Sequence, residues 1–197
     1  YYSTQSGLGQ AIAQQSARKE GEPLRIGVVG LGVGTIAAYG RPGDYVRFYE
    51  INPQVIEMSG LSKEFFSYVS ESRAKVDVVP GDARLSMERE LAAGDGQRFD
   101  VLAVDAFSGD AVPLHLLTAE AFDIYLRQLR GPESVMAFHV TNGNLDLSPA
   151  IARAAEAVGK SALLVRTTYP AECKNTWILV GAPSNLLAGG HSRELHA

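Results

Sequence analysis

The sequence predicts an α/β protein with a doubly wound, mostly parallel sheet of seven strands and an antiparallel strand at one edge. Short apolar runs rich in β-branched residues alternate with helix-like segments along most of the chain. The runs are almost continuously apolar, which is typical of parallel strands covered by helices on both faces. The first five end near a glycine turn, an acid or a histidine, and a parallel sheet gathers such residues at the edge where ligands bind.

Each element has its own signal in the sequence. Pro53 suits the first turn of a helix, and Thr118 and Ser148 are expected to cap two later helices, the second with Pro149 in its first turn. The expected strands are 24–30, 45–50, 74–82, 99–105, 134–141, 162–170 and 176–183. The expected helices are 9–17, a short helix after the glycine turn within 31–40, 53–58, 83–93, 117–130 and 148–159. We expect one domain over 1–197, with 184–197 as a tail that forms a surface helix or a frayed end.

Composition excludes several classes of protein. With 46% hydrophobic residues and a formal net charge of −4, the chain is typical of a globular protein that binds no nucleic acid, because its basic residues form no stripe. The single cysteine, Cys173, excludes an internal disulfide and agrees with a reducing compartment. We expect a cytoplasmic chain, or the soluble domain of a membrane-anchored protein, because the sequence lacks an initiator Met and a long apolar run.

A glycine turn follows the first expected strand. Gly30, Gly32 and Gly34 alternate in "VVGLGVGT", which allows close approach of the backbone to a ligand and presents the start of the next helix. A dinucleotide fingerprint needs its third glycine one place later, where Thr35 stands, so the spacing favours a nucleoside without a pyrophosphate. The alternative is a glycine turn used only for packing.

Acids end the next three expected strands. Glu50 lies twenty residues after Gly30, where ribose hydroxyls are held in nucleotide-binding sheets. Asp82 adds a polar group at the end of the third strand, although it is also placed to cap the helix that follows. Asp105 ends the apolar run "VLAVD" and Asp110 follows it before a proline.

These motifs together resemble a known family. "VVGLGVGT", "YEINP", "GDARL", "VDAFSGDAVP" followed by "HLLT", and "YP" followed by "TWILV" are similar to the catalytic domain of spermidine synthase-like proteins. That family is a branch of the S-adenosylmethionine-dependent methyltransferase, or Rossmann-like, fold. The resemblance extends over about 1–183 and is strongest to bacterial domains that are often fused to membrane segments. It implies that 1–23 is the remnant of an N-terminal domain and that the full-length protein forms a homodimer.

The resemblance assigns a role to each strand end. It implies that the three glycines cradle the nucleoside of S-adenosylmethionine or its decarboxylated form, that Glu50 binds the ribose, and that Asp82 faces the adenine, with Ile51 and Ala83 beside them. It implies that Asp105 is the catalytic aspartate. An alkylammonium, with a pKa of about 10, must lose a proton before it attacks, and a carboxylate can both attract the cation and take the proton. No metal is needed for this reaction.

The sequence departs from the family at two positions of the donor and amine sites. Val33 stands where spermidine synthases carry an acid that holds the donor amino group, and Ser108 stands where they carry a second aspartate. Asp110 could replace that second carboxylate in binding the amine, or it could cap the loop. These differences favour methyl transfer as the second reading.

Further side chains are candidates for the amine pocket. His139 stands where the family has a glutamine, and it either faces the substrate as a base or is held by backbone hydrogen bonds. Tyr169, with Pro170, and Tyr2, with Tyr1, match tyrosines that line the amine site, where aromatic rings attract cations, although either pair could serve packing. Trp177 is expected in the core, and no site is expected at Cys173.

Three functions remain open from the sequence. The first is transfer of an aminopropyl group from decarboxylated S-adenosylmethionine to a small polyamine or diamine acceptor, as in polyamine biosynthesis. The second is methyl transfer from S-adenosylmethionine, and the third is a non-catalytic nucleoside-binding domain of a larger membrane protein.

Overall fold

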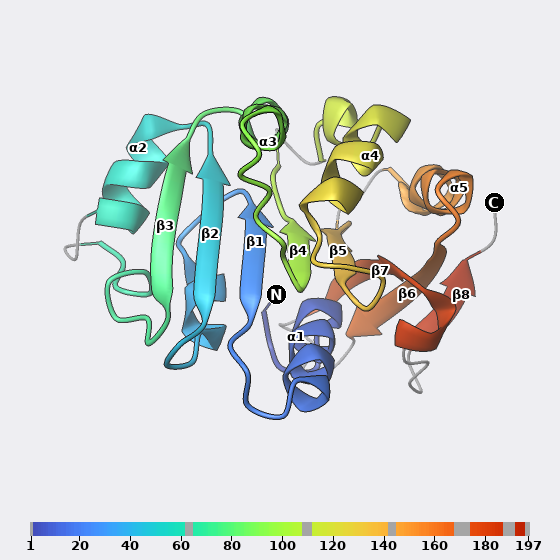
Figure 1. Cartoon of the computed structure of the whole chain (residues 1–197), viewed down its shortest axis with the longest axis horizontal. Coiled ribbons are helices and arrows are strands. Elements are labelled where there is room, and N and C mark those ends of the chain that lie inside the picture. The colour runs from blue at the N-terminus through green and yellow to red at the C-terminus, as the bar shows by residue number, and fades with distance from the viewer. Residues whose placement is uncertain are drawn as a thin grey trace.

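The computed structural model describes residues 2–61, 65–107, 112–141, 145–167, 174–186 and 192–195. Within these ranges one sheet of eight strands forms the centre of the molecule, in the order β3-β2-β1-β4-β5-β7-β6-β8, and Figure 1 shows these strands from left to right. The strands are β1 (Arg25–Val29), β2 (Tyr45–Glu50), β3 (Lys75–Pro80), β4 (Val101–Val104), β5 (Val135–His139), β6 (Ser161–Thr167), β7 (Asn175–Gly181) and β8 (Ser192–Leu195).

The predicted mostly parallel sheet is confirmed, with one strand more than predicted. Strands β1 to β5 pair in parallel, and β7 runs antiparallel to both of its neighbours, β5 and β6. The extra strand, β8, is an antiparallel edge strand made from 192–195. The expectation of a surface helix or a frayed end at this part of the tail was therefore wrong: pairing with β6 fixes it in the sheet.

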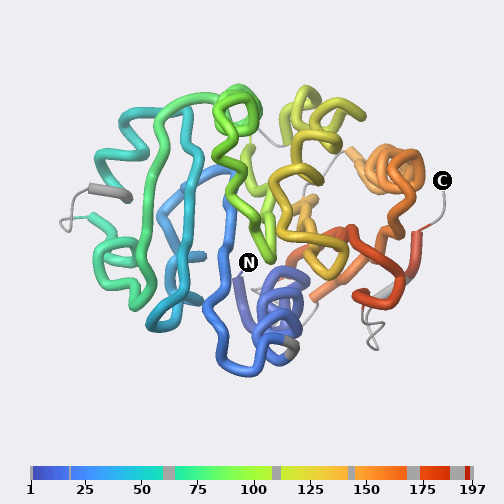
Figure 2. Tube along the Cα trace, viewed as in Figure 1, coloured from blue at the N-terminus to red at the C-terminus, as the bar shows by residue number. Residues whose placement is uncertain are grey.

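Helices cover both faces of the sheet. The α-helices are α1 (Gly7–Arg18), α2 (Pro53–Val55), α3 (Ala83–Ala92), α4 (Ala119–Gln128) and α5 (Ser148–Ala157). Side chains of α3, α4 and α5 share one buried apolar cluster with one face of the sheet, while α1 shares a second cluster with the other face. Figure 2 shows α1, in blue, against the middle of the sheet, and the orange strand β6 and the red strands β7 and β8 toward one side. No helix of the described ranges is long and apolar enough to cross a membrane.

The helix starts differ in how well the sequence predicted them. Thr118 caps α4 as expected, because its side chain accepts a hydrogen bond from the Ala121 N–H. Ser148 is not the cap of α5: the helix begins at Ser148 itself, and Asp146 Oδ1 accepts its N–H at 2.9 Å. The residue at the cap position is Leu147, which makes no side-chain capping hydrogen bond.

Two predicted helices have a different geometry. The segment after the glycine turn is a short 3₁₀ helix, η1 (Thr35–Tyr39), and the segment predicted over 53–58 continues from α2 into a π-helical turn, η2 (Ile56–Leu61). The short η1 therefore presents no long helix N-terminus to a ligand. A further short 3₁₀ helix, η3 (Leu114–Leu116), leads into α4, and η5 (Pro183–Asn185) follows β7.

Candidate active site

A cavity of about 720 Å³ opens at the carboxyl ends of β1, β2 and β4. This is the edge of a parallel sheet at which ligands bind, and the volume lies within the range of small-molecule sites, about 300–1,000 Å³. Eight of the residues predicted for the site line it: Tyr2, Gly30, Gly32, Glu50, Ile51, Asp82, Ala83 and Asp105. The sheet topology therefore brings together residues that are up to 103 positions apart in the chain.

The three glycines of the turn have different tasks. Gly30 has φ of +96°, and a Cβ there would lie 2.6 Å from the carbonyl oxygen of Asp105, so the first glycine permits close packing of β1 against the end of β4. Gly32 has φ of +54° and lines the cavity, and a Cβ added there would meet only open space. Gly34, predicted to cradle the nucleoside, does not line the cavity and instead begins η1 in the left-handed conformation.

Glu50 is fixed by the backbone around the glycine turn. Its Oε2 accepts the Leu31 N–H at 2.9 Å, and its Oε1 accepts the Asn52 N–H at 2.8 Å. The carboxylate is buried, with 9% of the residue exposed, and it lines the cavity. An ionised carboxylate has about four lone-pair sites, so two remain for hydroxyl donors of a ligand.

Asp82 is both a helix cap and a cavity residue. Its Oδ1 accepts the Leu85 N–H at 2.9 Å, which confirms the capping role considered from the sequence. Its Oδ2 lies 3.1 Å from His115 Nε2, and both side chains line the cavity. The sequence did not predict a role for His115, although this residue begins the "HLLT" motif. No local pattern indicates that it contacts Asp82, which is 33 positions away.

Asp105 lies one residue beyond β4 and is bound by two side chains. The Tyr2 hydroxyl donates to Asp105 Oδ2 at 2.6 Å, and His139 Nδ1 lies 2.6 Å from Oδ1. The side chain of Asp105 is 7% exposed and that of His139 is 5% exposed. The register explains the second contact, because Val104 of β4 pairs with Phe138 of β5 and the two functional residues follow directly.

His139 lies behind Asp105 rather than in the cavity wall. Its Nε2 is 2.8 Å from Thr141 Oγ1, and its ring stacks on Trp177 with centroids 4.5 Å apart. His139 is not among the described residues that line the cavity, and the contacts described for its ring nitrogens are to the side chains of Asp105 and Thr141, so its predicted role toward the substrate stays a prediction. Trp177 is fully buried in the core, as predicted.

The rim and the floor of the cavity are apolar. Ile51 is 69% exposed at the rim, and Phe107 lies edge-on to His139 with centroids 5.2 Å apart. Tyr49 lines the floor while its hydroxyl points away to Glu90 at 2.8 Å; burial, and then the neighbouring Glu90 carboxylate, raise the pKa of Tyr49 well above its usual value. A phenol in that state stays neutral and serves packing.

Some predicted site residues lie outside the described ranges. These are the expected second carboxylate and its neighbour, Asp110 and Ser108, and the expected tyrosine loop with Tyr169. Tyr1, Pro170 and Cys173 also fall outside them. Their predicted roles stay predictions.

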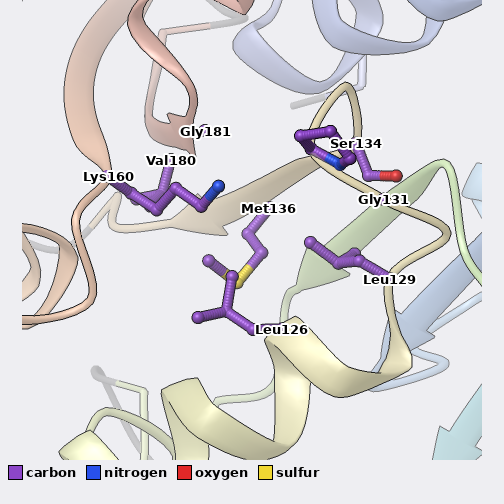
Figure 3. Close-up of a pocket in the computed structure, with 9 residues that line it drawn as sticks. Leu126, Leu129, Gly131, Ser134, Met136, Lys160, Val180 and Gly181 are labelled. Atoms are coloured by element: carbon purple, nitrogen blue, oxygen red, sulfur yellow. The ribbon is translucent and has the colours of Figure 1, made fainter.

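A second cavity, of about 290 Å³, lies at the opposite ends of the strands, where β5 begins and β7 ends. Figure 3 shows Leu126, Leu129 and Met136 gathered on one side of it and Lys160 on the other. None of the strand-end acids lines it. It is therefore separate from the candidate active site.

Comparison with known proteins agrees with the fold of the chain. The chain is 32% identical over 118 residues to a polyamine aminopropyltransferase of Vibrio vulnificus, and the match covers 58% of this chain and 37% of that protein. The chain is similar in structure to human methyltransferase-like protein 13 in complex with SAH, with a TM-score of 0.65, 21% identity and coverage of 92% of this chain and 84% of the other. A probable spermidine synthase from Corynebacterium glutamicum gives a TM-score of 0.60 at 20% identity, covering 96% and 74%. No family model matches.

The fold of the chain defines its structural class. The strand order, the reversed β7 and the structural likenesses define the S-adenosylmethionine-dependent methyltransferase, or Rossmann-like, fold. Within that class, the chain is similar in sequence to the aminopropyltransferase and similar in fold to the spermidine synthase. The chain spans little more than a third of the length of that curated relative.

Proposed function

We propose that this chain is a transferase that moves an aminopropyl group from decarboxylated S-adenosylmethionine to a polyamine or diamine acceptor. The observation that supports this best is the position of Asp105. Its carboxylate lines the cavity that also contains Glu50 and the glycine turn, and it is held on both oxygens by side chains. A nucleoside site and a candidate base therefore share one cavity.

The residues of the cavity fit a sulfonium nucleoside. Glu50 is fixed by two backbone N–H groups and keeps lone pairs for ribose hydroxyls, as acids at this position of nucleotide-binding sheets do. Gly32 leaves open space beside it, and Ile51 offers an apolar surface for an adenine ring. Asp82 also lines the cavity. One of its oxygens caps α3, and the other can accept a hydrogen bond from the exocyclic amine of adenine if His115 moves aside.

The proposed reaction needs one base. Asp105 accepts a proton from the acceptor ammonium, so that the amine lone pair attacks the propyl carbon beside the sulfonium. The new N–C bond forms as the C–S bond breaks, and methylthioadenosine leaves with the electron pair of that bond. The sulfonium of the donor is already a good leaving group. Alignment of the two substrates by the cavity walls therefore supplies much of the rate enhancement.

Methyl transfer from S-adenosylmethionine is the second candidate. It is favoured by Val33, which is 37% exposed on the glycine turn and offers no carboxylate to a donor amino group. Binding separates the two candidates: calorimetric titration with decarboxylated S-adenosylmethionine, methylthioadenosine and S-adenosylmethionine should show tighter binding of the first two if aminopropyl transfer is right. Preference for S-adenosylmethionine would support methyl transfer.

The role of Asp105 is tested by Asp105→Asn, which keeps the shape of the side chain and removes the base. We expect release of methylthioadenosine with putrescine as acceptor to fall by about 10²- to 10⁴-fold, as for loss of a general base. Binding of methylthioadenosine should stay within a factor of about three, because the nucleoside lies against Glu50. Asp123→Asn on the exposed surface of α4 is the matched control. A variant as active as the parent would refute the assignment of the base, and binding without any turnover in the parent would leave a nucleoside-binding domain.

A further inference from the structure

We propose that His139 is a positioning residue that Thr141 locks in a single tautomer, so that its Nδ1–H aims Asp105 at a cationic amine. The inference rests on the proposed function, which it deepens by naming the support behind the base. Three hydrogen-bond contacts connect the backbone of β7 to the carboxylate of Asp105 through Thr141 and His139, and Tyr2 donates to the other oxygen of that carboxylate.

The hydroxyl of Thr141 is the first link. The Thr176 N–H of β7 donates to Thr141 Oγ1 at 2.8 Å, so a lone pair of the hydroxyl is occupied and its one hydrogen must point elsewhere. Among the described residues two acceptors are within reach: His139 Nε2 at 2.8 Å and the Thr176 carbonyl oxygen at 3.4 Å. The shorter contact has the better hydrogen-bond distance. The network therefore assigns the hydroxyl hydrogen to Nε2, which must be unprotonated.

The imidazole is the second link. With Nε2 as acceptor, a neutral ring carries its proton on Nδ1, and this N–H donates to Asp105 Oδ1 at 2.6 Å. The opposite tautomer would put a nitrogen lone pair against a carboxylate oxygen at the same distance. The ring is also held sterically, because it stacks on Trp177 at an interplanar angle of 7° and meets Phe107 edge-on at 87°.

The carboxylate is the point at which the donors converge. Tyr2, from the segment before α1, donates to Oδ2, and His139, from β5, donates to Oδ1. An ionised carboxylate has about four lone-pair sites, so about two remain, and Asp105 lines the cavity while His139 does not. Since His139 donates from outside the cavity lining and Tyr2 occupies one site on the other oxygen, the remaining acceptor sites of Asp105 are left for the N–H groups of a substrate. This arrangement suits a cationic amine acceptor better than a neutral hydroxyl.

The tautomer is tested directly by ¹⁵N NMR of the histidine ring nitrogens in the parent chain. We expect His139 to show a protonated Nδ1 and an unprotonated Nε2. Thr141→Val should shift the Nε2 resonance and raise the fraction of rings that are protonated at Nε2, because the valine cannot donate to this nitrogen, whereas Thr141→Ser keeps the hydroxyl and should keep the parental pattern. A protonated Nε2 in the neutral ring of the parent, or a Thr141→Val spectrum identical to that of the parent, would overturn the inference without any measurement of activity.

Kinetic measurements test whether the contact between Thr141 and His139 contributes to the reaction. With methylthioadenosine release as readout, Thr141→Val should lower kcat about tenfold, the value of roughly one hydrogen bond, and leave the KM of the nucleoside within about twofold. Thr141→Ser should match the parent, and His139→Gln, which retains an N–H donor toward Asp105, should recover most of the activity that His139→Ala loses. Melting temperatures of all variants separate these effects from loss of folding.

The outcomes distinguish the two proposals. A parent chain that releases no methylthioadenosine from decarboxylated S-adenosylmethionine and putrescine refutes the proposed function, and with it the catalytic part of this inference. An active parent whose Thr141→Val variant keeps the parental kcat refutes the inference alone.

Discussion

Replacing Glu50 with glutamine should both destabilise the protein and weaken nucleoside binding. Each carboxylate oxygen accepts one backbone N–H, from Leu31 at 2.9 Å and from Asn52 at 2.8 Å, and the residue is only 9% exposed. In Glu50→Gln the side-chain carbonyl oxygen can accept one of these two N–H groups. The amide NH₂ faces the other N–H, and because both are donors, that hydrogen bond is lost. Hydrogen bonds to a charged group contribute about 1.5–3 kcal/mol each, so we expect a loss of about 2–3 kcal/mol in the free energy of unfolding.

Two assays read out this change. For a chain of this size each kcal/mol moves Tm by about 2–4 °C, so Tm should fall by about 4–12 °C in a thermal melt, whereas Glu57→Gln on the exposed side of η2 should leave it unchanged. Calorimetric binding of methylthioadenosine should weaken about tenfold, because one ribose hydrogen bond to a charged acceptor is lost. A Tm within about 1 °C of the parent would refute the hydrogen-bond argument. A lower Tm with unchanged binding would refute the ribose role and leave Glu50 as a support for the glycine turn.

Two further predictions concern stability. Burial acts to raise the pKa of Asp44, but its hydrogen bonds to Arg41 and to backbone N–H groups lower this pKa below the usual value. The contribution of Asp44 to the free energy of unfolding is therefore complete above about pH 4 and is lost as the pH falls through the lowered pKa. Asp44→Asn should cost about 2 kcal/mol at pH 7 in denaturant unfolding, and a deficit that persists unchanged at pH 2 would contradict this. Gly27→Ala should cost about 1–3 kcal/mol, because the new Cβ would lie 2.6 Å from the Phe99 ring, whereas Gly131→Ala enters open space; equal Tm values for these two variants would contradict the packing argument.

The sequence was sufficient for most of the sheet because parallel strands buried on both faces are continuous apolar runs. β4, with all four of its residues buried, is such a run. β8 lacks this signal: it is four residues long and lies at the edge of the sheet, where β6 is its one partner among the described strands. An edge strand of this kind is fixed by its partner and not by its own composition, so the extra strand could not be predicted locally.

The candidate site was predictable in position and only partly in contacts. The strand ends were found because the first five apolar runs stop near a glycine turn, an acid or a histidine, and a parallel sheet brings these positions to the same ends of the strands. The partners of Asp105 depend on information that no local pattern contains: the register of Val104 with Phe138, which places His139 beside it, and the path of a segment 103 residues earlier, which brings in Tyr2. Thr141 and His115 were missed for the same reason.

The three strand-end acids show how one residue type at one topological position takes different tasks. Glu50 accepts from two backbone N–H groups, and Asp82 accepts from one backbone N–H and faces His115 with its other oxygen. Removing either acid therefore disturbs the chain around it as well as any bound nucleoside. The observed partners of Asp105, within the described part of the chain, are the side chains of Tyr2 and His139. Asp105 is the acid that we assign to the chemistry because its carboxylate is oriented by these side chains and lines the cavity together with Glu50 and the glycine turn.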